Sequence, residues 1–123
     1  MLTLQNYING KWVDSKAGEY WDVVNPASQE VMAKVPGGAA ADVDAAATAA
    51  AAGFKEWKRI TPGKRIQYLF HLKRLLEENI NELSKTITLE SGKTFAEAKA
   101  EWIRAIENVE NACGIPALMQ GDF

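Results

Sequence analysis

The sequence has one cysteine and one histidine among its 123 residues, and therefore little of the chemistry that zinc binding or thiol catalysis requires. A single cysteine excludes a disulfide framework and fits a reducing compartment, so we expect a cytoplasmic protein. A zinc site needs three or four Cys, His or carboxylate ligands at characteristic spacings, and the sequence offers no such set. We therefore expect no metal site in the chain.

Long apolar runs, an excess of one charge and phosphate-binding loops are also absent. No stretch approaches the ~18 apolar residues of a membrane helix, and the start shows no secretory signal. Lys and Arg number 14 against 16 Asp and Glu, which gives no basic footprint for nucleic acid. Neither a Gly-x-Gly-x-x-Gly turn nor a Walker loop occurs. The sequence thus predicts no membrane or nucleic-acid partner, and no cofactor-binding turn within the chain.

What is present is the composition of one globular domain, with 47% hydrophobic and 24% charged residues. Alanine supplies 19 of the hydrophobic residues, so the core is expected to be thin. Strand-like runs precede helix-like runs, an order that favours an α+β arrangement within the chain.

The first 36 residues have the pattern of short antiparallel strands joined by turns. Asn9-Gly10 lies between two β-prone pairs and accepts the positive φ angles of a type I′ turn, which is a strong hairpin signal. Two further β-rich runs, 20–24 and 31–35, are separated by a turn that contains Pro26. We expect the strands to end at Pro36.

Three to four helices are expected after the strands. Ten of the fourteen residues from Ala39 to Ala52 are alanine, the best helix former. The spacing of three and four predicts that this helix packs through Val43, Ala46, Ala50, Phe54 and Trp57.

Start and stop signals divide the remaining helical pattern. Thr61-Pro62 predicts a helix start at which the threonine side chain bonds an orphan N–H. The pattern then runs to a C-cap at Gly92, with a break near Asn79 and Asn81. Thr94 and Glu97 have the spacing of a capping box. The last apolar stripe is predicted to comprise Phe95, Ala98, Trp102, Ile106, Val109 and Cys113.

Three positions invite a functional interpretation, and each has a plainer structural one. Cys113 is in phase with the apolar stripe, which favours a buried, inert thiol over a nucleophile. His71 has no acid or cysteine partner in the sequence, which favours a surface or interface histidine. Lys93 follows Gly92, but the two glycines of a Walker loop are missing, so a helix C-cap is favoured over a nucleotide site.

Arg104 lies about half a helical turn from the same stripe. One interpretation is a solvated helix face on which Glu101 and Glu107 are its ion-pair partners. The other is ligand binding, because a guanidinium holds a carboxylate with a fork of two N–H groups. The residues alone favour the solvated face and leave the second interpretation open.

Seven short motifs, taken in order, resemble the opening of an aldehyde dehydrogenase. They are Tyr7-Ile8-Asn9-Gly10-Lys11-Trp12, Asn25-Pro26-Ala27, Val35-Pro36, Asp42-Val43-Asp44-Ala45-Ala46, Phe54-Lys55-Glu56-Trp57, Pro62-Gly63-Lys64-Arg65 and Leu89-Glu90-Ser91-Gly92-Lys93-Thr94. No single motif is specific, but their order across nearly the whole chain is. The resemblance implies an α/β, Rossmann-like parent fold. It also implies that residues 1–123 are the N-terminal part of the NAD-binding domain, truncated before the cofactor turn and the catalytic domain.

The tail narrows the resemblance to one branch of the family. The segments similar to methylmalonate-semialdehyde dehydrogenases are Arg104-Ala105-Ile106-Glu107-Asn108-Val109-Glu110-Asn111-Ala112-Cys113 and Leu118-Met119-Gln120-Gly121-Asp122. Gly114-Ile115-Pro116, between these two segments, departs from the sequence pattern of the branch. Members of this branch are CoA-acylating: they oxidise malonate or methylmalonate semialdehyde with NAD and release an acyl-CoA. The resemblance therefore implies NAD and coenzyme A as cofactors of the full-length enzyme.

The same resemblance assigns few roles within this chain. The family's nucleophilic cysteine, general-base glutamate, oxyanion asparagine and cofactor turn all come later, so no catalytic residue is expected here and Cys113 is not the nucleophile. One role transfers: the arginine before Ile-Glu-Asn-Val-Glu holds the substrate carboxylate, and here it is Arg104. The implied partners are the remainder of the chain and further copies in a homo-oligomer, a dimer or tetramer. Two alternatives stay open, a segment of a non-acylating NAD(P) aldehyde dehydrogenase and a stand-alone helical interaction module.

Overall fold

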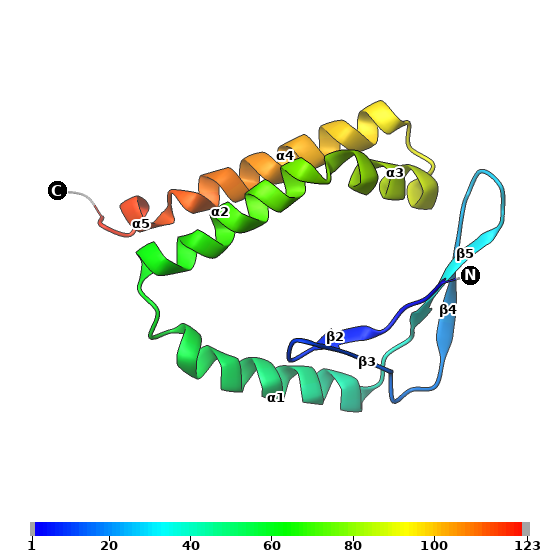
Figure 1. Cartoon of the computed structure of the whole chain (residues 1–123). Helices are drawn as coiled ribbons and strands as arrows, with labels where there is room; N and C mark the ends of the chain where they lie inside the picture. Colours follow the sequence, from blue (N-terminus) through cyan, green and yellow to red (C-terminus); the bar gives the residue numbers. More distant parts are fainter. Residues whose placement is uncertain (1, 122–123) are drawn as a thin grey trace. The chain divides into compact units, whose positions relative to one another are not determined.

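The computed structural model describes residues 2–121, which divide into two compact units (Figure 1). The first unit ends at Arg59 and contains the strands and one helix, and the second starts at Ile60 and is helical. Strands therefore precede helices, as predicted. Asp122, the last residue of the tail motif, lies outside the described residues. That both units belong to one NAD-binding domain stays a prediction.

One sheet of the first unit contains β1 (Leu2–Thr3), β5 (Val31–Pro36) and β4 (Tyr20–Val24), in that order. β4 and β5 pair antiparallel, as the two β-rich runs predicted. β1 pairs parallel to β5, an arrangement that the sequence did not predict. Two residues are too few to show an alternating pattern, so the sequence carries no local signal for this pairing.

The second sheet is a two-stranded hairpin of β2 (Asn6–Ile8) and β3 (Lys11–Val13). At its turn Asn9 has φ 53° and Gly10 has φ 73°, the left-handed angles that a type I′ turn requires. Tyr7 and Trp12 lie opposite each other across the strands, with ring centroids 4.9 Å apart. The hairpin prediction is confirmed.

A buried carboxylate connects the loop before β4 to the start of α1 (Ala40–Trp57). Asp42, only 6% exposed, accepts hydrogen bonds from the Ser15 hydroxyl at 2.7 Å, the Lys16 backbone N–H at 3.1 Å and the Ala39 backbone N–H at 2.9 Å. These donors hold the pKa of Asp42 below its ordinary value, the Lys16 N–H contributing most and then the Ser15 hydroxyl. The carboxylate thus fixes where the loop meets the helix.

Asp42→Ala is expected to lower the melting temperature of the chain by several degrees at neutral pH, because three donors lose their acceptor. Asp44→Ala, at an exposed position in the same turn, is the matched control and should change it little. Since the folded pKa of Asp42 is lowered, its stabilisation is present above the ordinary aspartate pKa and is lost as the pH falls through the folded value. Thermal unfolding followed by circular dichroism should therefore show the two variants converging at low pH. Equal melting temperatures at pH 7 would contradict this role of Asp42.

The packing face of α1 differs from the predicted one. α1 contacts β2, and Ala45, Ala46 and Ala49 are half-buried. The predicted face stays largely open, since Val43 is 69% and Phe54 60% exposed. The prediction is therefore wrong for contacts within this unit. Alanine offers no bulk to distinguish one side of the helix from another, so the hairpin determines which side packs.

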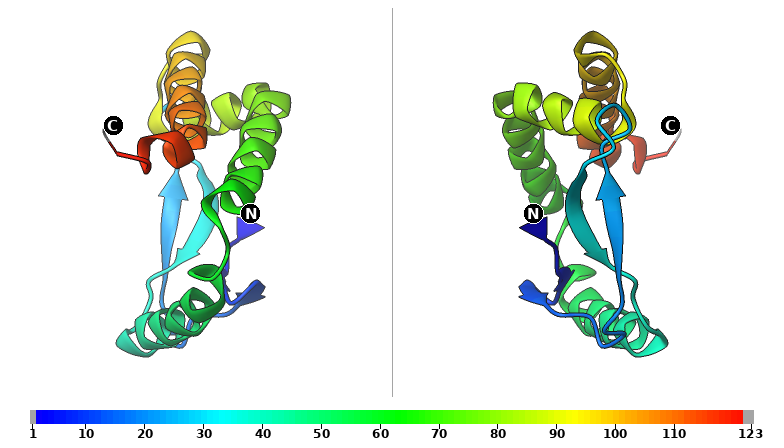
Figure 2. Two further views of the ribbon diagram at one scale, coloured as in Figure 1. Left: turned by 90° about the vertical axis from the view of Figure 1, so that its left-hand side faces the viewer. Right: turned by 90° about the vertical axis from the view of Figure 1, so that its right-hand side faces the viewer.

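Four helices form the second unit: α2 (Pro62–Glu78), α3 (Ile80–Ser91), α4 (Phe95–Cys113) and the short α5 (Ile115–Leu118). α4 contacts each of the other three, and Figure 2 shows α2 running alongside it. Among the described residues the buried apolar side chains are Ala98, Ile106 and Cys113, all on α4. The expected thin core is confirmed.

The helix boundaries follow the local signals closely. α2 ends before Asn79, and Gly92 caps α3 with a left-handed φ of 75°, both as predicted. Thr61 occupies the N-cap of α2, but its side chain makes no capping hydrogen bond, so that part of the prediction is wrong. Phe95 is 45% exposed rather than part of the buried stripe. It lies in the first turn of α4, ahead of Ala98, the first buried residue of the helix.

Candidate functional site

The first turns of α4 are fixed by a complete capping box. The Thr94 hydroxyl accepts a hydrogen bond from the Glu97 N–H at 3.3 Å, and the Glu97 carboxylate accepts one from the Thr94 N–H at 3.0 Å. The Thr94 hydroxyl and N–H together lower the pKa of Glu97. One turn further on, Lys93 Nζ contacts a Glu101 carboxylate oxygen at 2.7 Å. The helix that carries Arg104 therefore starts from a rigid anchor.

Arg104 lies on the exposed side of α4, away from buried Ala98 and Ile106. Within residues 2–121 its guanidinium makes no hydrogen bond and no ion pair. Glu101, one of its two expected partners, is instead held by Lys93, whose hydrogen bond is the largest cause of the lowered pKa of Glu101. Glu107, the other expected partner, forms no ion pair with it inside that range. The five donors of the guanidinium are thus open to a ligand.

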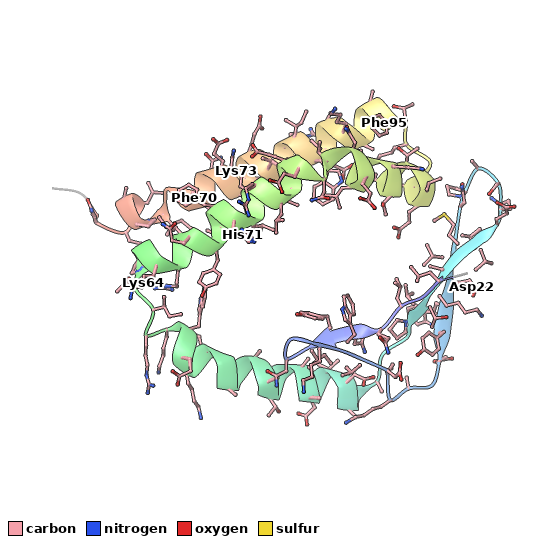
Figure 3. All side chains as sticks on the ribbon, viewed as in Figure 1. Asp22, Lys64, Phe70, His71, Lys73 and Phe95 are labelled. Atoms are coloured by element: carbon pink, nitrogen blue, oxygen red, sulfur yellow. The ribbon has the colours of Figure 1, made fainter. Side chains whose placement is uncertain are left out.

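The structure places the other candidates in structural roles. Cys113 is a free, buried thiol on α4, as predicted. His71 is exposed in the middle of α2 (Figure 3), where Arg74 Nη2 donates to its Nδ1 at 3.1 Å. Lys93 forms an ion pair with Glu101.

The described residues contain no group of three or more His, Cys, Asp and Glu side chains able to hold a metal ion. Nor do their helices include one long and apolar enough to cross a membrane.

Asp42 is the residue whose role the sequence did not reveal. The sequence does contain a local signal for this role, because Asp42 lies in the first turn of an alanine-rich helix. A carboxylate at that position interacts favourably with the backbone N–H groups that have no partner within the helix. Its partners Ser15 and Lys16 are more than 25 residues away, and no local pattern identifies them.

Comparison with known proteins decides the family. Residues 12–123 match the aldehyde dehydrogenase family. The chain belongs to this family. Malonate-semialdehyde dehydrogenase of Bacillus subtilis (strain 168) is 49% identical over 119 residues, and that of Listeria innocua serovar 6a is 48% identical over 119 residues. Each alignment covers 97% of this chain and 24% of the relative. This aldehyde dehydrogenase chain thus spans about a quarter of the length of these curated relatives.

Solved aldehyde dehydrogenases share the backbone as well as the sequence. Methylmalonate-semialdehyde dehydrogenase from Oceanimonas doudoroffii superimposes with a TM-score of 0.93 at 36% identity, over 99% of this chain and 25% of that one. A Sinorhizobium meliloti protein assigned to the same enzymes, solved with NAD, gives a TM-score of 0.91 at 34% identity, over 96% of this chain and 24% of that one. The α/β parent fold expected from the resemblance is therefore confirmed, and so is the resemblance itself.

Proposed function

We propose that this chain is the N-terminal segment of an NAD-dependent, CoA-acylating dehydrogenase that oxidises malonate or methylmalonate semialdehyde. The observation that carries the proposal is the exposed guanidinium of Arg104, which lacks an ion-pair partner within residues 2–121 although Glu101 and Glu107 are its neighbours on the helix. Both substrates carry a carboxylate besides the aldehyde. The names of relatives 48–49% identical to this chain support the same substrate class.

The chemistry of the Arg104 side chain suits that carboxylate. Two parallel N–H groups of a guanidinium match the two oxygens of a carboxylate, and such charge-assisted pairs are short and directional. The capping box at Thr94 and the Lys93–Glu101 ion pair fix the start of the helix from which Arg104 projects. Fixing the carboxylate end of a three-carbon substrate also fixes where its aldehyde lies, which is what a specificity residue must do.

The starts of α1 and α4 do not fit the phosphates of NAD or coenzyme A. A dinucleotide binds at a glycine-rich turn and a free helix N-terminus. Here the Asp42 carboxylate already occupies the start of α1 and the Glu97 carboxylate that of α4, so both would repel a phosphate. NAD would accept the hydride and coenzyme A the acyl group. Both sites would lie in other parts of the enzyme.

We also propose a location and partners for the enzyme. We infer a cytoplasmic homo-oligomer whose partners are the remainder of the chain and its own copies, with neither nucleic acid nor membrane as a partner. Support comes from the near balance of charges and from the single unpaired cysteine, Cys113.

The test is an assay of the complete enzyme that carries this chain, with NAD and malonate semialdehyde, in the presence and absence of coenzyme A. We expect NADH to form with coenzyme A and an acyl-CoA thioester to accumulate, detected by mass spectrometry. Formation of the free acid without any need for coenzyme A would instead establish the non-acylating alternative. A reading frame that ends after Phe123 would favour the stand-alone interaction module.

A further inference from the structure

One carboxylate on α4 has two cations beside it. Glu101 lies three positions before Arg104, a spacing at which opposite charges on a helix are neighbours. Its carboxylate instead contacts Lys93 Nζ at 2.7 Å. The positive charge of Arg104 also contributes to the lowered pKa of Glu101, after the contributions of Lys93, so the guanidinium and the carboxylate are close enough to interact. Lys93 therefore holds a carboxylate that would otherwise be available to Arg104.

The backbone fixes Lys93 from both sides. Gly92 before it ends α3 with a left-handed φ of 75°, and Thr94 after it is the N-cap of α4. The Thr94 N–H and hydroxyl donate to the Glu97 carboxylate at 3.0 and 2.7 Å. Only the side chain of Lys93 remains to be ordered when the ion pair forms, which limits the entropic cost of the pair. The lysine is thus presented to the first turns of α4 by two fixed neighbours.

The charge that a substrate carboxylate meets at Arg104 depends on this pair. Lys93, Glu101 and Arg104 together carry one net positive charge. Without the lysine the sum is zero, and the Glu101 carboxylate would both pair with the guanidinium and repel the carboxylate of the substrate. Glu107 is a weaker competitor, because an acid on the C-terminal side of its basic partner has the less favourable orientation on a helix.

We propose that Lys93 is a positioning residue for substrate binding: by holding Glu101, it keeps the guanidinium of Arg104 available to the substrate carboxylate. This inference rests on the proposed function, because the ligand of Arg104 is the carboxylate of the semialdehyde. Lys93 itself contacts neither the substrate nor a reacting atom in this account. Its removal should therefore raise KM for a substrate that carries a carboxylate and leave kcat unchanged.

The experiment measures KM and kcat for malonate semialdehyde and for propanal in the complete enzyme that carries this chain. Lys93→Gln removes the cation, Lys93→Arg keeps it, and the double variant Lys93→Gln/Glu101→Gln removes the carboxylate as well. The matched control is Lys34→Gln, which removes the lysine of another half-exposed ion pair, Lys34–Asp22 at 3.2 Å between β5 and β4. The melting temperature of each variant is recorded.

Lys93→Gln should raise KM for malonate semialdehyde about two- to fivefold, the range expected when an exposed ion pair on a helix competes with the substrate. KM for propanal and both kcat values should stay the same. Lys93→Arg should keep the wild-type KM. The double variant should return KM close to the wild-type value, because no Glu101 carboxylate is left to compete for Arg104 and the net charge is again positive. Lys34→Gln should change neither KM.

Two results would overturn the positioning role: an unchanged KM in Lys93→Gln, or a raised KM that persists in the double variant. Arg104→Leu in the same assay separates this inference from the proposed function. If Arg104→Leu loses malonate semialdehyde selectively and Lys93→Gln has no effect, the positioning role fails and the carboxylate site stands. If Arg104→Leu affects both substrates alike, the carboxylate site fails and the positioning role fails with it.

Discussion

Arg104→Leu is expected to lower kcat/KM for malonate semialdehyde about ten- to hundredfold in the complete enzyme. A hydrogen bond to a charged group contributes about 1.5–3 kcal/mol, and each ~1.4 kcal/mol corresponds to a factor of ten in rate. Leucine keeps part of the aliphatic stem and removes the guanidinium, including the two N–H groups that would bind the carboxylate. Steady-state kinetics with NAD and coenzyme A in excess measure the loss.

Two further variants separate recognition of the carboxylate from other effects. Arg104→Lys should recover only part of the loss, because an ammonium keeps the charge but not the fork of two N–H groups. Arg74→Leu makes the same substitution at an exposed arginine of α2 that already contacts Glu78 and His71, and it should leave kcat/KM unchanged. An equal loss in Arg74→Leu would indicate that removing any surface arginine harms the enzyme, and would contradict a specific role for Arg104.

The second large effect is the absence of activity in the 123-residue chain alone. We expect no NADH above a buffer blank when the purified chain is incubated with NAD and malonate semialdehyde. Its one thiol, Cys113, is buried in α4, and its one histidine, His71, lies on α2 bonded to Arg74. We therefore expect neither the thiol nor the imidazole to serve as an activated nucleophile or its base in attack on an aldehyde. NADH absorbance at high protein concentration provides the measurement.

Cys113→Ser is the control for that assay. Activity that survives this substitution would identify either a contaminating dehydrogenase or an unrecognised site. Activity that the substitution abolishes would make Cys113 a nucleophile and would contradict its assignment as a structural thiol. The variant is close in size to the original residue, so a packing defect is expected to be small.

The local features of the fold were predictable because their causes are local. The Asn9-Gly10 turn, the glycine cap at Gly92 and the capping box of Thr94 and Glu97 each depend on residues within a few positions of one another. Such signals act through backbone geometry and through hydrogen bonds within one turn. The structure contains all three where the sequence placed them.

Features set by distant contacts were not predictable in this way. The parallel pairing of β1 with β5 joins segments about thirty residues apart, with Leu2 opposite Ala33. The partners of Asp42 lie in another loop, and the packed side of α1 is chosen by a hairpin rather than by the helix pattern. In each case the sequence supplied the residues, and tertiary contacts decided between equivalent arrangements.

The candidate site shows the same division. The family resemblance pointed to Arg104, and helical spacing placed it away from the buried stripe. Its lack of an ion-pair partner within the described residues depends on Lys93 binding Glu101 across eight positions, from the loop before α4. Spacing within a helix favours partners three or four residues away, so it pointed to an Arg104–Glu101 pair instead.

The most direct test of carboxylate binding by Arg104 is the ratio of kcat/KM for malonate semialdehyde to that for propanal, measured in the wild-type enzyme and in Arg104→Leu. Propanal has the same three carbons and the same aldehyde but no carboxylate. If Arg104 binds the carboxylate, the substitution should reduce the ratio about ten- to hundredfold, with propanal nearly unaffected. A ratio that stays the same, whether both values fall together or neither changes, would contradict the assignment of Arg104 as the carboxylate-binding residue.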